Sequence, residues 1–272
     1  LNANIDGEQA YEIYGNIGEL DYLSFGIKEN RYSKDGTMLS LGEIDMRDME
    51  IENSGDFILY LGGDETPKNY LPMPKNANML IVRQTYKNRI KQTHAKINIK
   101  NVALAPIPEL LTTEKLNDQL NQTLGFVSGT ASTFLKWVKE FKLNHKNSLP
   151  LGDQSFFQAA GGDPKICYLH GYYDFNNDEC MEITTDIPEC EYWNFQLENY
   201  WMESLDYRHY PIHINNASAT LEDDNSIIIT VSHSPINVKN NLITEGRNNG
   251  AMLLRWIGLS LIHISEPTRP SL

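Results

Sequence analysis

The segment from Cys190 to Tyr210, CEYWNFQLENYWMESLDYRHY, concentrates amide, carboxylate, guanidinium and aromatic side chains. Aromatic rings stack on sugars while amides and carboxylates bind hydroxyl groups, so this mixture is typical of a site for a carbohydrate or another small polar ligand. The alternative is an Asp206–Arg208 pair that fixes a loop under an aromatic lid. The candidate ligand-binding residues are Asn194, Gln196, Trp201, Glu203, Asp206, Arg208 and, on a later strand, Arg255.

Two histidines in the last third of the sequence could bind a metal ion. His213 and His233 fall on predicted strands, and their imidazoles would converge if those strands paired as a hairpin, with His209 or His170 completing the set. Neutral imidazoles on rigid strands suit zinc, iron or copper. The alternative is that these are structural histidines held by hydrogen bonds. A divalent metal is therefore one hypothesis, and the sequence identifies no other cofactor.

No established catalytic motif occurs in the sequence, whether Gly-x-Ser-x-Gly, a Walker loop, Gly-x-Gly-x-x-Gly or His-Glu-x-x-His. Glu203 and Asp206 could perform acid/base chemistry only if a fold held them at a substrate with different pKa values. Whether the protein is an enzyme is left undecided, with His213/His233 and Glu203/Asp206 as the alternatives. A third hypothesis is a structural or assembly domain.

The charge balance argues against two classes of partner. The 272 residues include 23 Lys and Arg and 36 Asp and Glu, which gives a net charge of -13. Nucleic acids and anionic membranes need clusters of Lys and Arg, and the sequence contains none. It also contains no apolar run of about eighteen residues, so we expect no membrane-spanning segment. The composition is typical of a soluble globular protein, with the cytoplasm favoured and the compartment undetermined.

The three cysteines have no metal-binding spacing. Cys167, Cys180 and Cys190 are widely and irregularly separated, without a Cys-x-x-Cys pair. We expect three reduced, mostly buried thiols, with a single disulfide as the alternative in an oxidising compartment.

Both ends of the sequence differ from those of a typical domain. It begins LNANIDGEQ, without a methionine, so we expect a fragment that lacks an N-terminal region, itself a candidate partner. Near the other end, LSLIHISEPTR resembles the translation of a sequencing adapter. We therefore expect residues 259–272, including His263, to be a tail that is not native.

Two sets of short runs rich in β-branched and aromatic residues predict strands. The first set is AYEIYG, LDYLSFGI, DFILYL, NMLIVRQTY and AKINIKNV, and the second is CMEITTDI, EYWNFQL, PIHINNASATL, SIIITVSH and GAMLLRW. Tyr11–Phe25 aligns with Met181–Phe195 without a gap, and the later runs keep the same order. Within EYWNFQL, strand alternation predicts that Trp193, Phe195 and Leu197 point into the core. Their equivalents in the first set are Leu23, Phe25 and Ile27, and the opposite faces carry Asn194 and Gln196 or Ser24 and Gly26.

Two further features of the repeat bear on ligand binding. Ser24 and Gly26 are small, so they would leave room for a ligand if the two copies approach each other there. Arg83 and Arg255 end matching strands, and the match favours a shared structural role for them over substrate binding.

Between the two sets, apolar residues recur at helical spacing from Leu116 to Val138. Thr113 and Glu114 suit a helix start, and Gly125 and Gly129 could bend the helix or allow close packing. A second, short helix in DQSFFQAA should end at the following glycines.

These patterns predict an α+β, mainly β fold, in which a duplicated β-sandwich or jelly-roll-like domain carries a helical insertion between its two copies. We expect the first β repeat over residues 1–100, the insertion over 101–165 and the second repeat over 166–258, with both repeats forming one compact domain.

The segments EYWNFQLENYWMESLDYR, HGYYDF, LIVRQTY and GAMLLRW together resemble the uncharacterised, mainly bacterial family called domain of unknown function 1214. The resemblance runs from Gly7 to Gly258. It implies a jelly-roll-like β-sandwich with a longer, largely helical N-terminal region, and it implies no reaction and no catalytic residue. The chain departs from the family pattern at Asn240-Asn241-Leu242, where relatives tend to have Asn-Trp-Leu.

Overall fold

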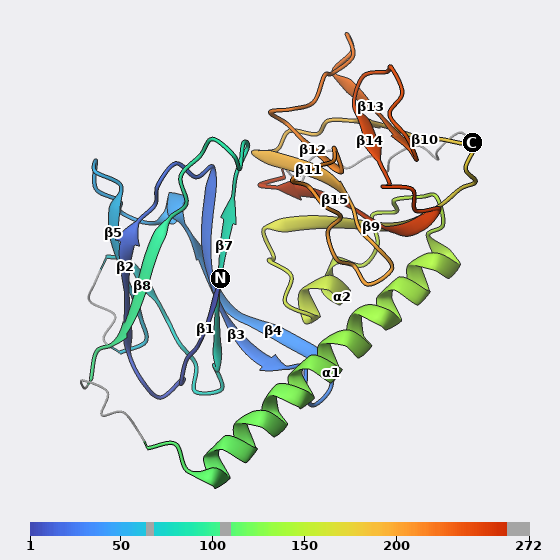
Figure 1. Ribbon diagram of the computed structural model, residues 1–272. Helices are drawn as coiled ribbons and strands as arrows, with labels where there is room; N and C mark the ends of the chain where they lie inside the picture. The colour runs from blue at the N-terminus through green and yellow to red at the C-terminus, as the bar shows by residue number, and fades with distance from the viewer. Residues whose placement is uncertain (64–67, 104–109, 260–272) are drawn as a thin grey trace. The chain divides into compact units, whose positions relative to one another are not determined.

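The computed structural model describes residues 1–63, 68–103 and 110–259 (Figure 1). The chain divides into two compact units, unit 1 over residues 1–129 and 158–163 and unit 2 over 130–157 and 164–272. The described residues form four sheets and few helices, which confirms the prediction of a mainly β chain. The predicted tail lies, except for Leu259, outside the described residues. Among these residues, no helix is both long enough and apolar enough to span a membrane.

Unit 1 contains two four-stranded sheets, in the orders β1-β7-β3-β4 and β6-β5-β2-β8. Neighbouring strands are antiparallel except β5 and β6, which are parallel. The inward side chains of both sheets form one hydrophobic cluster that includes Ile13, Phe25, Leu59 and Val82. The elements are β1 (Asn2–Asn4), β2 (Tyr11–Asn16), β3 (Tyr22–Arg31), β4 (Thr37–Asp45), the 3-10 helix η1 (Met46–Asp48), β5 (Asp56–Leu61), β6 (Tyr70–Leu71), β7 (Met79–Thr85) and β8 (Lys96–Asn101).

Unit 2 contains a four-stranded sheet, β12-β11-β15-β9, and a three-stranded sheet, β10-β13-β14. Here too one pair, β13 and β14, is parallel and the others are antiparallel. A hydrophobic cluster joins the inner faces, with Ile183, Phe195, Ile229 and Leu254 among its members. The strands are β9 (Ile166–Asp174), β10 (Met181–Asp186), β11 (Tyr192–Leu197), β12 (His213–Asn215), β13 (Ser226–Ser232), β14 (Asn241–Ile243) and β15 (Asn249–Ile257).

The predicted inward residues of the two matching strands are confirmed. Trp193, Phe195 and Leu197 of β11 belong to the core of unit 2. In unit 1 the core includes Leu23, Phe25 and Ile27 of β3. The opposite faces of these strands are more buried than the outer face of a surface strand: Ser24 is 1% and Asn194 8% exposed. Both strands therefore present a second, buried or nearly buried face that is polar.

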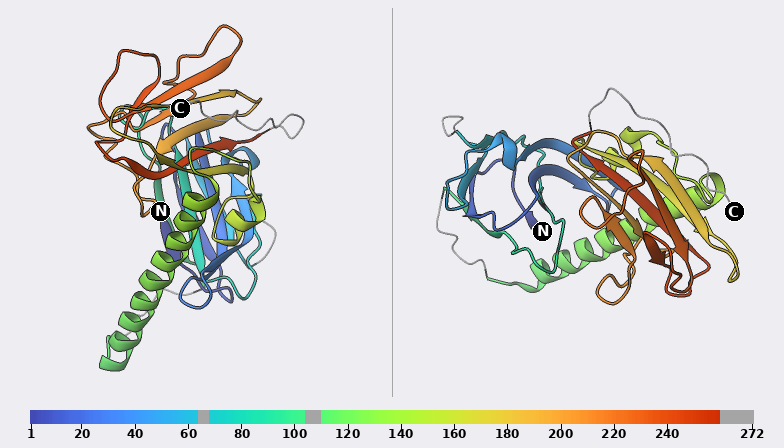
Figure 2. Two further views of the ribbon diagram at one scale, coloured as in Figure 1. Left: turned by 90° about the vertical axis from the view of Figure 1, so that its right-hand side faces the viewer. Right: turned by 90° about the horizontal axis from the view of Figure 1, so that it is seen from above.

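The predicted long helix is α1 (Thr113–Asn144), which runs without interruption through both glycines (Figure 2). A Cβ atom at Gly129 would overlap the carbonyl oxygen of Tyr32, so close packing, rather than a bend, explains this glycine. In the second half of α1, Trp137, Val138 and Phe141 are buried. The first half exposes much of its apolar stripe: Leu116, Leu120, Leu124 and Val127.

The short helix α2 (Gln154–Ala159) matches the second predicted helix. It is followed by Gly161 at a φ of +99°, a conformation that favours glycine, which confirms the predicted helix end.

Each unit uses one asparagine to hold its parallel strand pair. Asn69 precedes β6, and its side-chain amide donates to the carbonyl oxygens of Glu50 and Ile58 at 2.8 Å each, while its oxygen accepts from the Glu50 N–H at 2.7 Å. Asn240 precedes β14 and contacts Thr220 and Ile228 in the same way, with donor distances of 2.7 and 2.9 Å and an accepted bond of 2.8 Å. Three hydrogen bonds thus converge on one side chain in each unit.

Candidate functional site

The outer face of the sheet β12-β11-β15-β9 brings several predicted residues of unit 2 together. Because side chains alternate along a strand, Asn194 and Gln196 lie opposite the core residues of β11, and Arg255 lies opposite those of β15. Asn194 and Arg255 are direct cross-strand partners. Gln196 Nε2 donates to Glu198 Oε1 at 2.8 Å, which places Glu198 on the same face. Three predicted residues therefore share a surface with one acid that the sequence analysis missed.

Glu198 is the most unusual acid of this face. Its side chain is buried, and Oε2 has no hydrogen-bond partner among the described residues. Burial raises the pKa of Glu198 to about 7, although the positive charge of Arg255 and the hydrogen bond from Gln196 oppose the shift. Near neutral pH the carboxyl group can therefore either donate or accept a hydrogen bond.

Arg255 has hydrogen-bonding capacity that the described residues do not use. Its side chain is partly exposed, and its guanidinium group makes no hydrogen bond or ion pair within the described chain. The Asn194 amide, 8% exposed, makes none there either. A guanidinium group offers five N–H donors in a planar fork, the geometry that binds a carboxylate with two parallel hydrogen bonds.

His170 of β9, the strand at one end of this sheet, lies at the side of this face. It is 5% exposed, and the rings of Phe157, Phe141 and Trp137 lie 4.6, 5.1 and 5.8 Å from its ring, centroid to centroid. Burial, and secondarily the charge of Arg255, lowers the pKa of His170 to about 3, so the ring is neutral over the physiological range. The half of α1 that belongs to unit 2 thus supplies an aromatic wall beside the polar residues.

The remaining predicted ligand residues lie on the loop after β11 and are occupied by local contacts. Asn199 Nδ2 donates to Glu203 Oε2 at 2.7 Å, and Asp206 accepts from Arg208 Nε at 3.0 Å. These bonds match the alternative in which the loop is fixed by its own ion pair. No hydrogen bond or ion pair within the described chain links these residues to Asn194, Gln196 or Arg255. Trp201 is 56% exposed.

The predicted hairpin between the strands of His213 and His233 does not form. Strand β12, which begins at His213, and β13, which ends just before His233, belong to different sheets. His233 Nδ1 is 2.8 Å from Thr244 Oγ1, its Nε2 is 3.0 Å from the Asn176 carbonyl oxygen, and its ring stacks on Phe175. Within residues 1–63, 68–103 and 110–259, no group of three or more His, Cys, Asp or Glu side chains is arranged to hold a metal ion. Metal binding at His213 and His233 stays a prediction.

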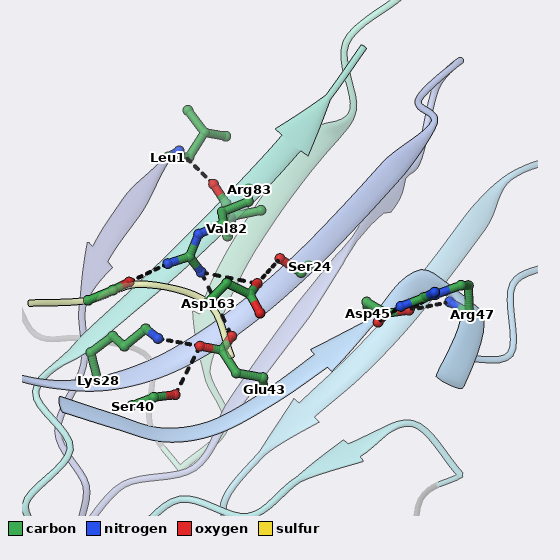
Figure 3. Close-up of polar contacts among 11 residues, drawn as sticks. Leu1, Ser24, Lys28, Ser40, Glu43, Asp45, Arg47, Val82, Arg83 and Asp163 are labelled. Carbon is green, nitrogen blue, oxygen red and sulfur yellow. Dashed lines mark hydrogen bonds and ion pairs between the residues drawn. The ribbon is translucent and has the colours of Figure 1, made fainter. Parts of the chain in front are cut away.

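The corresponding outer face of unit 1 carries four charged residues that contact one another (Figure 3). Lys28, whose side chain is fully buried, forms an ion pair with Glu43. Arg83 Nη1 lies 3.6 Å from Asp163 Oδ2 and 3.8 Å from Glu43 Oε2, and its Nη2 donates to the Gly161 carbonyl oxygen at 2.6 Å. Burial lowers the pKa of Lys28 and raises that of Glu43, while their mutual attraction opposes both shifts. Arg83 thus has the structural role that the sequence analysis favoured.

Within unit 1, the space that two small residues of this face leave is occupied by carboxylates. Gly26 pairs with Glu43 across the strands, and a Cβ atom at Gly26 would collide with the Glu43 carboxylate. Ser24 Oγ donates to Asp163 Oδ2 at 3.3 Å. Within unit 1, these small residues therefore accommodate two carboxylates.

The three cysteines are free thiols, in line with the expectation of reduced residues. Cys167 and Cys190 are half-buried, and burial raises the pKa of each to about 11. Cys180 is exposed, so the expectation of mostly buried thiols is wrong for this residue.

Fold and site together define a mainly β protein of two units, one of which has a polar face with unused hydrogen-bonding groups. The chain is similar to a crystal structure of an uncharacterised protein from Burkholderia cenocepacia, with a TM-score of 0.93 and 34% identity over 99% of this chain and 74% of that chain. The chain belongs to the family of that bacterial protein. It is also similar in fold to the VPA0106 protein from Vibrio parahaemolyticus, at a TM-score of 0.59 and 10% identity, covering 100% of this chain and 88% of that chain. No family model and no curated protein matches the chain.

Proposed function

We propose that this chain is a binding module for a small polar ligand, a carbohydrate or another, and that the outer face of the sheet β12-β11-β15-β9 is its site. The observation that carries the proposal is the Arg255 guanidinium group, which no described residue engages although Asn194 and Glu198 lie beside it. Leaving a partly buried cation and a buried amide without partners costs free energy. A ligand that accepts hydrogen bonds from both groups would recover that cost.

The residues of this face favour a ligand that carries a carboxylate next to hydroxyl groups, such as a sugar acid. The Arg255 fork suits the two oxygens of a carboxylate. Asn194 and Gln196 can donate to and accept from hydroxyl groups, and Glu198 is neutral for much of its population below pH 7, which limits its repulsion of an anion. The His170 ring and its aromatic neighbours form an apolar boundary.

A thermal-shift panel tests the proposal, using neutral sugars, sugar acids, simple hydroxy acids, and divalent metals with and without a chelator. A ligand at one hundred times its dissociation constant stabilises the protein by about 2.7 kcal/mol, which raises Tm by a few degrees in a chain of this size. We expect a sugar acid to raise the Tm of the wild type and not that of Arg255→Lys, which keeps the charge and loses the fork.

The matched control is Arg208→Lys, because Arg208 is exposed and already paired with Asp206. It should respond like the wild type. If no sugar, sugar acid or hydroxy acid shifts the wild type, or if Arg255→Lys responds fully, the proposal is wrong. A metal-specific shift that the chelator reverses would favour the metal hypothesis at His213 and His233, and with it an enzyme.

We also propose that the two units are copies of one jelly-roll-like β-sandwich. Support comes from their strand orders, since β1-β7-β3-β4 and β6-β5-β2 correspond to β9-β15-β11-β12 and β14-β13-β10. The registers agree as well: Ser24 pairs with Arg83, and Asn194 with Arg255. The equivalent bonds of Asn69 and Asn240 support the same proposal.

The finer family assignment, to domain of unknown function 1214, is part of this proposal. It rests on the EYWNFQL strand and the loop that follows, and on the relationship to an uncharacterised bacterial protein. A family alignment that places Arg255 and Asn194 at variable positions would count against both the assignment and the site.

A further inference from the structure

Strands β5, β2 and β8 of the other sheet of unit 1, β6-β5-β2-β8, lie side by side (Figure 1). The outer face of this sheet carries a groove of about 1110 Å³. Its floor consists of alternate residues of β2 and β5, including Glu12, Tyr14 and Tyr60, and one wall is formed by Glu50–Glu52 and Lys68–Asn69. The hydrogen bonds of Asn69 fix this wall against β5, because they join it to Glu50 and Ile58. The groove is therefore built on a rigid sheet and a braced edge.

The floor exposes aromatic and aliphatic surface where a solvent-facing strand would normally be polar. Tyr14 is 39% exposed and Ile58, its direct cross-strand partner, is 45% exposed. Tyr60 pairs with Glu12, so the two tyrosines are diagonal neighbours on the same face of the sheet. Diagonal neighbours of this kind lie about 7–8 Å apart between Cα atoms, close enough for two rings to form one platform.

The polar groups around this platform are mostly paired with one another. Lys100 Nζ lies 2.7 Å from Glu12 Oε1 and 5.4 Å from the centre of the Tyr14 ring. Lys68 pairs with Glu50 at 2.8 Å, and Asn16 Nδ2 donates to Asp56 Oδ1 at 2.8 Å. The lining contains three lysines and four carboxylates, a net charge of 3 − 4 = −1.

This combination favours an uncharged ligand with many hydroxyl groups. A strongly anionic ligand would be repelled by the slight excess of carboxylates, and a cation would compete with lysines already in place. Sugar rings present apolar faces that stack on tyrosine, and their hydroxyl groups can bond to carboxylate and amide oxygens that already accept one bond. A groove of about 1110 Å³ also has room for more than one sugar ring.

We propose that this groove is a second binding site, for a neutral oligosaccharide, with Tyr14 and Tyr60 as its stacking platform. The proposal does not rest on the polar face of unit 2, since the two sites share no residue and favour different ligands.

Titration calorimetry of the full chain against tetrasaccharides of glucose, xylose and mannose tests the groove. We expect at least one of them to bind in the micromolar to millimolar range. Tyr14→Ala and Tyr60→Ala should each weaken that binding by about threefold to tenfold, since an aromatic stacking contact contributes roughly that factor. Tyr14→Trp should retain it.

The matched control is Tyr210→Ala, because Tyr210 is 47% exposed and lies outside the groove. Circular dichroism would establish that the variants are folded, which is expected because Tyr14 is on the surface. Absence of binding to every tetrasaccharide, or equal affinity in wild type and Tyr14→Ala/Tyr60→Ala, would overturn the proposal. Loss of binding in Arg255→Lys would do so too, because it would assign the sugar to unit 2.

Discussion

Each unit has an arginine on the face of a sheet opposite its core, and the two arginines have different surroundings. Arg83 pairs with Ser24 across the strands and is held by Asp163, Glu43 and the Gly161 carbonyl group. Arg255 is the cross-strand neighbour of Asn194, and its guanidinium group makes no hydrogen bond or ion pair within the described chain. The two arginines therefore differ in their contacts: Arg83 completes an internal network, and Arg255 has donors that no described residue uses.

The difference arises from the types of residue around each arginine. Lys28 and Glu43 form the buried pair of unit 1, and Gly26 makes room for the carboxylate. When the sequence alignment of Tyr11–Phe25 with Met181–Phe195 is continued along the strand, Gln196 and Glu198 align with Gly26 and Lys28. An acid therefore stands in unit 2 where unit 1 has a base, and the pKa of that acid is about 7.

The largest expected effect comes from breaking the network of unit 1. Glu43→Ala leaves the fully buried Lys28 ammonium group without its partner, so the free energy of unfolding should fall by about 3–5 kcal/mol. Urea unfolding measures this. The double variant Lys28→Met/Glu43→Leu should recover much of the loss, and Glu50→Ala, which breaks the exposed Lys68–Glu50 pair, should cost about 1 kcal/mol or less. An equal loss of unfolding free energy in Glu43→Ala and Glu50→Ala would show that the buried pair stabilises the fold no more than an exposed one.

The next effect tests the unpaired acid of unit 2. The pKa of Glu198 is about 7 in the folded chain against 4.5 for an ordinary glutamate, so the unfolded state ionises first as pH rises. The free energy of unfolding should therefore be highest below pH 4.5. It should decrease by about 3 kcal/mol as the pH rises through 7. Glu198→Gln should remove this decrease, which unfolding measurements between pH 4.5 and 8 can follow. Glu203→Gln, at an exposed acid of the same unit, should leave the profile unchanged, and parallel profiles for wild type and Glu198→Gln would contradict the prediction.

The smallest expected effect concerns Asn69 and Asn240, whose side chains make the same set of hydrogen bonds in the two units. Asn69→Ala and Asn240→Ala each remove three hydrogen bonds that hold a parallel strand pair, so each should destabilise the chain by about 1–3 kcal/mol. Thermal or urea unfolding would measure both. Asn248→Ala, at an exposed side chain whose one hydrogen bond within the described chain is to Asn177 at 3.1 Å, is the control. A loss in one asparagine variant and none in the other would weaken the proposed equivalence of the units.

Much of the fold could be predicted because its strands have strong local signals. DFILYL coincides with β5, and EYWNFQL contains β11, since alternation and β-branched or aromatic residues mark them. Strand β4, TMLSLGEID, is absent from the predicted strands, and its glycine and charged residues make its local strand signal weak. Its Glu43 is nevertheless the residue that neutralises Lys28.

The charged network of unit 1 could not be predicted from sequence, because it depends on residues distant in sequence. Ser24 and Asp163 are 139 residues apart, and no local pattern connects them. Glu198 was within reach of sequence reasoning, since it continues the alternation of Asn194 and Gln196 by one step. Sequence adjacency groups the loop residues with the strand. In the structure, Glu203 is instead hydrogen-bonded to Asn199, and Arg208 to Asp206.

The asparagines that precede β6 and β14 also offer a way to recognise distant relatives. Each satisfies three backbone groups that no other side-chain type could satisfy with the same geometry, whereas the faces of the neighbouring sheets accept different residues in the two units. We therefore expect an asparagine at these two places to persist in relatives whose overall identity has fallen to the 10% seen with the Vibrio parahaemolyticus protein. Aligning chains on these asparagines would compare their folds before any assumption is made about what each one binds.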